Sequence, residues 1–202
     1  MTETLCFVLD GTLVRRTRSD AAVLEAVFEQ YGIEASDGNL AAATDAFRRA
    51  FAAMESEPYR QSMAAAVEAS DGDADPDAIA DTLRAETYDA TAVSEAAPDS
   101  LAGLTENSRL AVVADGPRAW QVGKLEHHGL VEQFDAVVSS YEVGSHLPDP
   151  AVFERVRQRL PADEYVAVGQ KRDLTGARSA GFAPIHYERD GLDLWAAVDA
   201  LL

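Results

Sequence analysis

The run Thr4-Leu5-Cys6-Phe7-Val8-Leu9, which ends at Asp10-Gly11, decides the fold predicted for this chain. An uncharged, largely apolar run that stops at a turn signal is typical of a strand buried on both faces of a parallel sheet. Similar short runs follow much later, with helical patterns between them, at 110–114, 136–138, 165–168 and, more weakly, 183–187. Strands that alternate with helices predict an α/β fold with a doubly wound parallel sheet of about five strands.

A long segment from Val14 to about Ala97 separates the first run from the second and carries no strand signal. It is rich in Ala, Glu, Arg and Leu, which favour helices. Helices are predicted near 20–31, 40–54, 59–68 and 76–90. The sequence therefore predicts two domains: a sheet domain of residues 1–14 and 98–202, and an inserted helical domain of residues 15–97.

The charge balance narrows the choice of partners. The 202 residues include 35 Asp and Glu against 17 Lys and Arg, which gives a formal net charge of −18. Such a charge repels phosphate backbones and anionic lipids, so neither nucleic acid nor a membrane surface is an expected partner. Lys124 and Lys171 are the only lysines, and the arginines are scattered rather than gathered in a patch. This acidic composition is typical of proteins adapted to concentrated salt.

Cysteine usage and the apolar runs indicate a cytoplasmic location. The lone Cys6 permits no internal disulfide. The stretch Met1–Leu13 lacks the basic and then apolar pattern of a leader, and no run of 18 apolar residues occurs anywhere. We therefore expect the protein in the cytoplasm.

Four segments resemble, in the same order, the four motifs of the haloacid dehalogenase-like (HAD) hydrolase superfamily. They are Phe7-Val8-Leu9-Asp10-Gly11-Thr12-Leu13, the stretch 110–118, the stretch 142–153 with Leu147-Pro148-Asp149-Pro150, and the stretch 168–181 with Gly169-Gln170 and Asp173. The resemblance covers nearly all the chain. It implies a Rossmann-like core with the helical insertion as the family's cap domain, and it implies phosphatase or dehalogenase chemistry.

The positions that carry this chemistry in the family are replaced here. The resemblance places Val8 at the nucleophilic Asp, Ala114 at the Thr or Ser that binds the phosphoryl group, Leu147 at the Lys, and Gln170 at an acid that holds Mg²⁺. An isopropyl group cannot attack phosphorus or carbon, and losing a covalent nucleophile typically costs on the order of 10⁶ in turnover. We therefore expect no phosphatase or dehalogenase activity by the family's mechanism, no bound metal and no cofactor.

Asp10 and Asp115 keep acidic groups near the predicted site. Asp10 occupies the family's general acid/base position and is expected to be idle, capping the loop after the first strand through backbone N–H groups. Alternatively, it activates a water for direct attack on a labile ester. Asp115 either binds a cation or a sugar hydroxyl, or caps a helix that starts at Pro117. The residues predicted to line a binding cleft are Gly11, Thr12, Asp115, Gly116 and Asp173.

Other residues are expected to have structural roles. Cys6 shares a strand face with Val8 and is expected to be inert, because a buried thiol without a cationic neighbour stays protonated. Trp120 and Trp195 are expected to pack in the interior. The histidines lack the spacing of metal ligands and are expected at the surface or at helix ends: His127, His128, His146 and His186.

Local signals in the helices have similar interpretations. Asp149-Pro150 is typical of a helix start, and Gly176-Ala177 would let a helix approach the sheet closely. Arg48 and Arg49 either meet an anion in the cleft or lie on an exposed helix face.

Two functions are consistent with the sequence. The first is a HAD-like protein that acts by binding or regulation, with a small metabolite in the cleft or a protein partner. The second is a divergent HAD hydrolase of the phosphatase kind, acting on a small phosphorylated metabolite with Mg²⁺.

The acidic composition predicts that stability depends on concentrated salt. The Debye length falls to about 3 Å at 1 M salt, so repulsion among the carboxylates is screened there. The melting temperature should therefore rise between dilute buffer and molar KCl. An unchanged melting temperature would count against this prediction.

Overall fold

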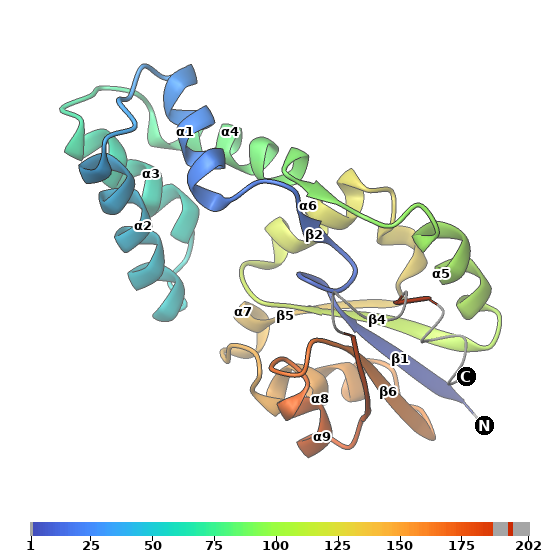
Figure 1. Ribbon diagram of the computed structural model, residues 1–202. Helices are drawn as coiled ribbons and strands as arrows, with labels where there is room; N and C mark the ends of the chain where they lie inside the picture. Colours follow the sequence, from blue (N-terminus) through green and yellow to red (C-terminus); the bar gives the residue numbers. More distant parts are fainter. Residues whose placement is uncertain (1, 188–193, 196–202) are drawn as a thin grey trace. The chain divides into compact units, whose positions relative to one another are not determined.

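The computed structural model describes residues 2–187 together with 194 and 195. The chain divides into two compact units, unit 1 of Met1–Arg15 and Ala92–Leu202, and unit 2 of Arg16–Thr91 (Figure 1). The second boundary falls earlier than the sequence analysis places it. The reason is that Ala97 and Leu101, from the helix α5 (Ala97–Thr105), are buried in the core around the sheet.

Unit 1 is built on a five-stranded parallel sheet, which confirms the predicted fold class. The strands are β1 (Glu3–Val8), β4 (Ser108–Ala114), β5 (Ala136–Ser139), β6 (Glu164–Gly169) and β7 (Ala183–His186), in the spatial order β5-β4-β1-β6-β7. β1 is central, with Phe7 level with Val112 on one side and Val168 on the other. The chain extends the sheet first on the β4 side and then on the β6 side. The order therefore reverses between β1 and β6, and open sheets bind ligands at the carboxyl ends of such strands.

Helices cover both faces of this sheet (Figure 1). One face packs on α5 and α6 (Arg118–His127), the other on α8 (Pro150–Arg159) and α9 (Thr175–Ser179). Side chains alternate along β1, so Leu5 and Phe7 lie in the first core and Cys6 and Val8 in the second. The remaining short helices of unit 1 are η1 (Val131–Gln133) and α7 (Ser140–Val143).

The predictions for buried side chains in unit 1 are confirmed. Cys6 is buried on the face of Val8, and burial raises the pKa of its thiol far above the usual range, so it stays protonated. Trp120 is buried, and Trp195 packs on Phe7 with ring centroids 6.0 Å apart. Neither tryptophan is a stacking platform at the surface.

Unit 2 contains the four predicted helices, α1 (Asp20–Gln30), α2 (Asp37–Ala52), α3 (Pro58–Ala69) and α4 (Pro76–Asp89). The segment is not free of strands, however. β2 (Arg15–Arg16) pairs with β3 (Thr91–Ala92) where the chain leaves and re-enters the sheet domain. Strands of two residues are too short to leave a periodic pattern in the sequence.

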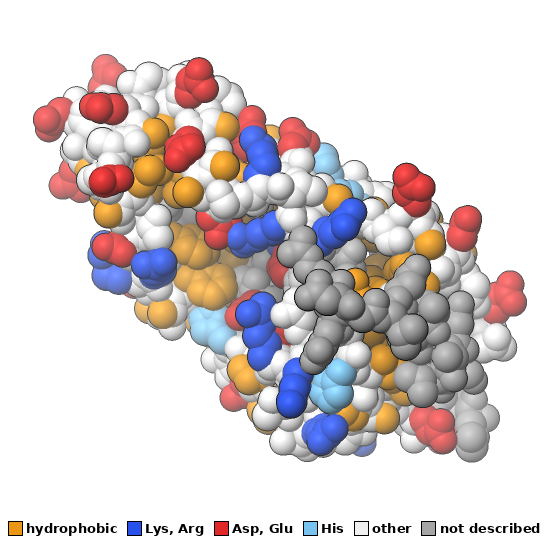
Figure 2. Space-filling model, viewed as in Figure 1, with side chains coloured by type: hydrophobic (Ala, Val, Ile, Leu, Met, Phe, Trp, Pro, Cys, Tyr) orange, Lys and Arg blue, Asp and Glu red, His pale blue; other side chains and the backbone are white. Residues whose placement is uncertain are grey.

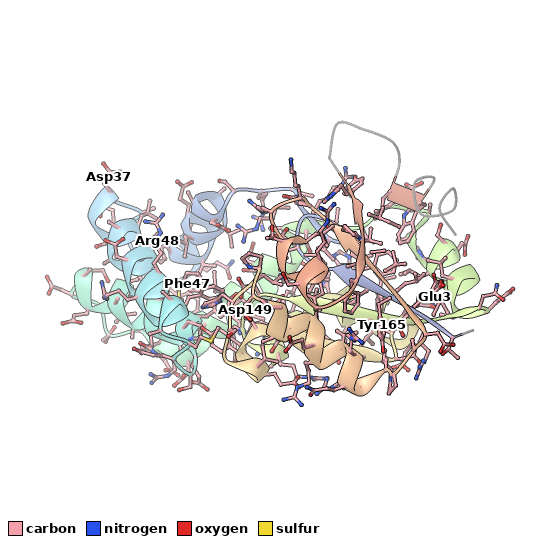
Figure 3. The ribbon with its side chains drawn as sticks, turned by 90° about the horizontal axis from the view of Figure 1, so that it is seen from below. Glu3, Asp37, Phe47, Arg48, Asp149 and Tyr165 are labelled. Atoms are coloured by element: carbon pink, nitrogen blue, oxygen red, sulfur yellow. The ribbon has the colours of Figure 1, made fainter. Side chains whose placement is uncertain are left out.

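The surface of the helices is polar, as their composition suggests. Arg48 and Arg49 lie on the exposed face of α2, with Arg48 beside Phe47 in the chain (Figure 3). Figure 2 shows acidic side chains spread singly over the visible surface of the molecule rather than in one patch. Among the described residues, none of the helices combines the length and apolar character needed to cross a bilayer.

The start of α8 forms as predicted, but α9 packs differently. The Asp149 carboxylate accepts a hydrogen bond from the Ala151 N–H at 2.9 Å, and Pro150 follows as the first helical residue (Figure 3). Gly176 does not serve an approach of α9 to the sheet. A Cβ at Gly176 would lie 1.9 Å from the Pro148 carbonyl oxygen, so its missing side chain makes room for the loop before α8.

Gly176→Ala should therefore lower the free energy of unfolding, by about 1–3 kcal/mol, because the backbone of Pro148 has to move. Gly103→Ala in α5 is the matched control. A Cβ there meets nothing within 4 Å, and Ala is the better helix former, so this variant should gain up to about 1 kcal/mol. Urea titration measures both, and equal losses in the two variants would contradict the packing argument.

Candidate functional site

The candidate site lies at the carboxyl ends of β1 and β6, and its floor is apolar. Val8 ends β1 and is 3% exposed. A Cβ built on Gly169, at the end of β6, would lie 2.6 Å from the Val8 Cγ2 atom. The isopropyl group thus fills the space that Gly169 leaves open, and position 8 is part of the core packed on α8 and α9.

The loop after β1 is held by backbone hydrogen bonds and by Gln170. Gly11 has a φ of +80° and donates its N–H to the Val14 carbonyl at 2.8 Å. The Gln170 amide Nε2 donates to the Gly11 carbonyl at 3.1 Å. A Cβ on Gly11 would lie 2.5 Å from this nitrogen, the flexible end of the Gln170 side chain, so it is the positive φ that favours glycine here. Gln170 therefore turns an N–H donor toward the loop.

Asp10 forms an ion pair with Lys124. The Lys124 ammonium donates to Asp10 Oδ1 at 2.5 Å. The Lys124 side chain is 7% exposed and that of Asp10 is 42% exposed. The sequence analysis expected Asp10 to cap its own loop, and the structure adds a cation from α6 within reach of the carboxylate. The open side of Asp10 remains accessible to solvent.

Lys124 is the site residue that the sequence analysis missed. It lies in the last turn of α6, one position before the buried Leu125 and three after the buried Gln121. A lysine on the apolar stripe of a helix, in a chain with two lysines, was the available signal. Lysine is almost never buried unless it is paired, so this position required a carboxylate partner.

A second polar pair forms beside the end of β4. The His146 Nδ1 atom lies 2.6 Å from Asp115 Oδ1. Asp115 does not cap α6, because the N-cap position is Pro117 and no side chain caps this helix. His146 is also more than a surface residue, since tertiary packing brings it to Asp115 from the loop between α7 and α8. The Gln121 side chain donates to the Asp115 carbonyl at 2.9 Å and holds this turn in place.

Asp173 adds a third carboxylate to the same region. Burial raises the pKa of Asp173 above its usual value, and the charges of Asp115 and Asp10 raise it further. The Arg172 guanidinium, with Nε 3.4 Å from Asp173 Oδ1, opposes this shift of the pKa. Three of the carboxylates singled out in the sequence therefore interact electrostatically.

The remaining predicted positions have mostly structural contacts. Gly116 donates its N–H to the Ser140 hydroxyl at 2.9 Å. The buried Thr12 hydroxyl has no hydrogen-bond partner among the described residues. Ala114 is buried and Leu147 packs against the core beneath α8, so neither offers a polar group.

Magnesium, which the resemblance implies, does not fit this site. It requires oxygen ligands in near-octahedral geometry. Val8 has no oxygen, and Gln170 directs its amide nitrogen, a hydrogen-bond donor, toward the Gly11 carbonyl. Within the described part of the chain, no three His, Cys, Asp or Glu side chains are grouped so as to hold a metal ion.

Comparison with known proteins agrees with the resemblance. The family model described as haloacid dehalogenase-like hydrolase matches residues 5–186. A glyceraldehyde 3-phosphate phosphatase of Methanothermobacter thermautotrophicus is 34% identical over 102 residues, a match that covers 43% of this chain and 45% of that protein. The match thus spans less than half the length of this curated relative.

Solved structures share the fold. A 2-haloacid dehalogenase from Pseudomonas syringae superposes with a TM-score of 0.74 at 20% identity, over 100% of this chain and 98% of that one. A HAD phosphatase from Thermococcus onnurineus gives a TM-score of 0.62 at 22% identity, over 96% and 89% of the two chains. At this level of identity the likeness concerns the fold alone.

Asp173→Asn should stabilise the protein at neutral pH. A carboxyl group whose pKa is raised by folding binds its proton more tightly in the native state, so it lowers stability as the pH rises above its unfolded pKa of 3.8. The variant should therefore melt at a higher temperature than the parent at pH 7 and at the same temperature well below that pKa.

Glu154→Gln is the matched control for this variant, since Glu154 is exposed on α8. It should leave the difference between pH 7 and acid unchanged. A parent-like melting curve for Asp173→Asn at pH 7 would show that folding does not raise the pKa of Asp173.

Proposed function

The chain belongs to the haloacid dehalogenase-like hydrolase family, and we propose that within this family it acts by binding a small metabolite or a protein partner rather than by hydrolysis. The observation that carries this proposal is the burial of Val8. The family resemblance places the attacking carboxylate at this position, and here an aliphatic side chain packs on Gly169 with 3% of its surface exposed.

Replacing Val8 by an acid would not by itself supply the missing chemistry. Ala114 has no hydrogen-bond donor for an oxyanion. Gln170 offers an N–H at the position where the family has a carboxylate that binds Mg²⁺. Groups that act together in catalysis fail together, so the losses do not add as separate small effects. At the proposed site, the groups that the family mechanism needs are therefore replaced together.

The polar groups at the sheet edge support binding. The Asp10–Lys124 pair is held by α6, the Asp115–His146 pair joins two loops, and Asp10 keeps an accessible side. Fixed donors and acceptors at the carboxyl edge of a parallel sheet are the usual elements of a small-molecule site. A cytoplasmic location is part of the proposal, as are the exclusions of nucleic acid and membrane surfaces, because the net charge of −18 repels both.

A divergent hydrolase of the phosphatase kind is the second candidate. It is favoured by the likeness to the protein named glyceraldehyde 3-phosphate phosphatase and by the exposed side of Asp10, which could accept a proton from water. Against it, the replaced positions Val8 and Ala114 offer no donor that would stabilise an electrophile, and Asp10 is already paired with the Lys124 ammonium.

Turnover of phosphomonoesters distinguishes the two candidates. In molar KCl with Mg²⁺, p-nitrophenyl phosphate and glyceraldehyde 3-phosphate should be hydrolysed no faster by the parent protein than by Val8→Ala. Parent turnover that Val8→Ala abolishes, or that Asp10→Asn abolishes, would overturn the proposal.

Val8→Asp is expected to stay as inactive as the parent, because the hydroxyl at position 114 and the acid at position 170 are still absent. Phosphate release measured over hours provides the needed sensitivity. Robust turnover by this single variant would mean that the other replacements matter far less than their chemistry suggests.

A further inference from the structure

The buried ammonium of Lys124 balances the charge of a carboxylate at the edge of the sheet. A lysine that is only 7% exposed requires a partner, and the structure supplies Asp10 at 2.5 Å. Trp120 and Leu125 flank it on α6 and are both buried. The cation is therefore held by packing on one side and by a carboxylate on the other.

Asp10 is the carboxylate that contacts this ammonium. The two neighbouring carboxylates have other partners, since His146 contacts Asp115 and the largely exposed Arg172 contacts Asp173. Lys124 is thus the buried cation that pairs with Asp10, the carboxylate retained in the motif-one loop.

A divalent metal is poorly suited to this site. The floor position is Val8, and the Gln170 amide is committed as a donor to Gly11. The ammonium itself is a further obstacle, because it repels a dication from the one carboxylate that the motif-one loop retains. The pair nevertheless needs both of its charges, since the Lys124 ammonium is 7% exposed and an unpaired buried ammonium is costly.

We propose that the Lys124 ammonium is the resident cation of this site and takes over the charge compensation for which the family relies on a metal. The inference deepens the proposed function, because it makes any binding at this site independent of divalent cations. The cation comes from α6, outside the four motif segments, so it replaces neither Leu147 nor Gln170 at their own positions. Lys124 is a positioning residue that fixes the orientation of the Asp10 carboxylate.

The test compares metal binding by the parent protein, Lys124→Met and Lys171→Met. Lys171 is the other lysine and is exposed, which makes it the matched control. In molar KCl, calorimetric titration with Mg²⁺ and with Mn²⁺ should give no saturable binding to the parent or to Lys171→Met. Lys124→Met should bind Mn²⁺ with a dissociation constant at least about tenfold below the highest concentration at which the parent shows no binding, because one repelling charge has gone.

Thermal melting with and without EDTA gives a second readout. The parent should melt at the same temperature in both conditions. In EDTA, Lys124→Met should melt about 2–4 °C below the parent, and Mg²⁺ should restore part of this difference. Saturable metal binding by the parent, or a Lys124→Met variant that matches the parent in both stability and metal affinity, would overturn the proposal.

Two further variants keep the test decisive if Lys124→Met does not fold. Lys124→Arg retains the positive charge and should stay indifferent to metal. Lys124→Met combined with Asp10→Asn removes both partners, and it should be more stable than Lys124→Met alone. A double variant that is less stable than Lys124→Met would contradict the pairing.

The failures of the two proposals are distinguishable. Phosphatase turnover that continues in EDTA would refute the proposed function and leave the resident cation intact. An inactive parent protein that binds Mg²⁺ at a single saturable site would refute the resident cation and leave the proposed function intact.

Discussion

The parallel pairing of β1 with both β4 and β6 is the constraint on which the rest of this structure depends. Both edges of β1 are hydrogen-bonded and both of its faces are covered by helices, so the residues from Leu5 to Leu9 are buried. The register brings Val8 to the level of Gly169, and the two pack in direct contact. The loop after β1 therefore begins above an apolar contact, at the point where the strand order reverses.

The polar groups above this contact form pairs that compensate one another's charge. Lys124 binds Asp10 and His146 contacts Asp115, each pair joining segments far apart in the chain. A buried cation that loses its carboxylate partners is unfavourable, and so are buried carboxylates that lose their cation. A lysine on α6 balances the carboxylates that remain. In the proposed function, the site relies on these pairs for its charge balance and not on a metal ion.

Exposed charges and buried charges in this protein differ in how strongly dissolved salt screens them. The exposed carboxylates are screened by salt over a few ångströms when the salt is concentrated. Buried groups are screened much less. The buried Lys124 is paired with a carboxylate of the protein, whereas many of the acidic side chains lie at the surface (Figure 2).

The strands and most helices could be predicted because each depends on a local pattern: an apolar run for β1, and helix formers in unit 2, with Ser19 capping α1 and Asp75 capping α4. The side chain at position 8 is likewise a property of the sequence alone. β2 and β3 could not be predicted, because strands of two residues have no period.

The contacts at the site were decided only by tertiary structure. Lys124 and Asp10 are 114 positions apart, and His146 and Asp115 are 31 apart. Which donor meets which carboxylate depends on how α6 and the loop between α7 and α8 pack on the sheet, and no local pattern encodes that packing. The sequence by itself determined that position 8 has no attacking group, whereas the fold determined which cation Asp10 would receive.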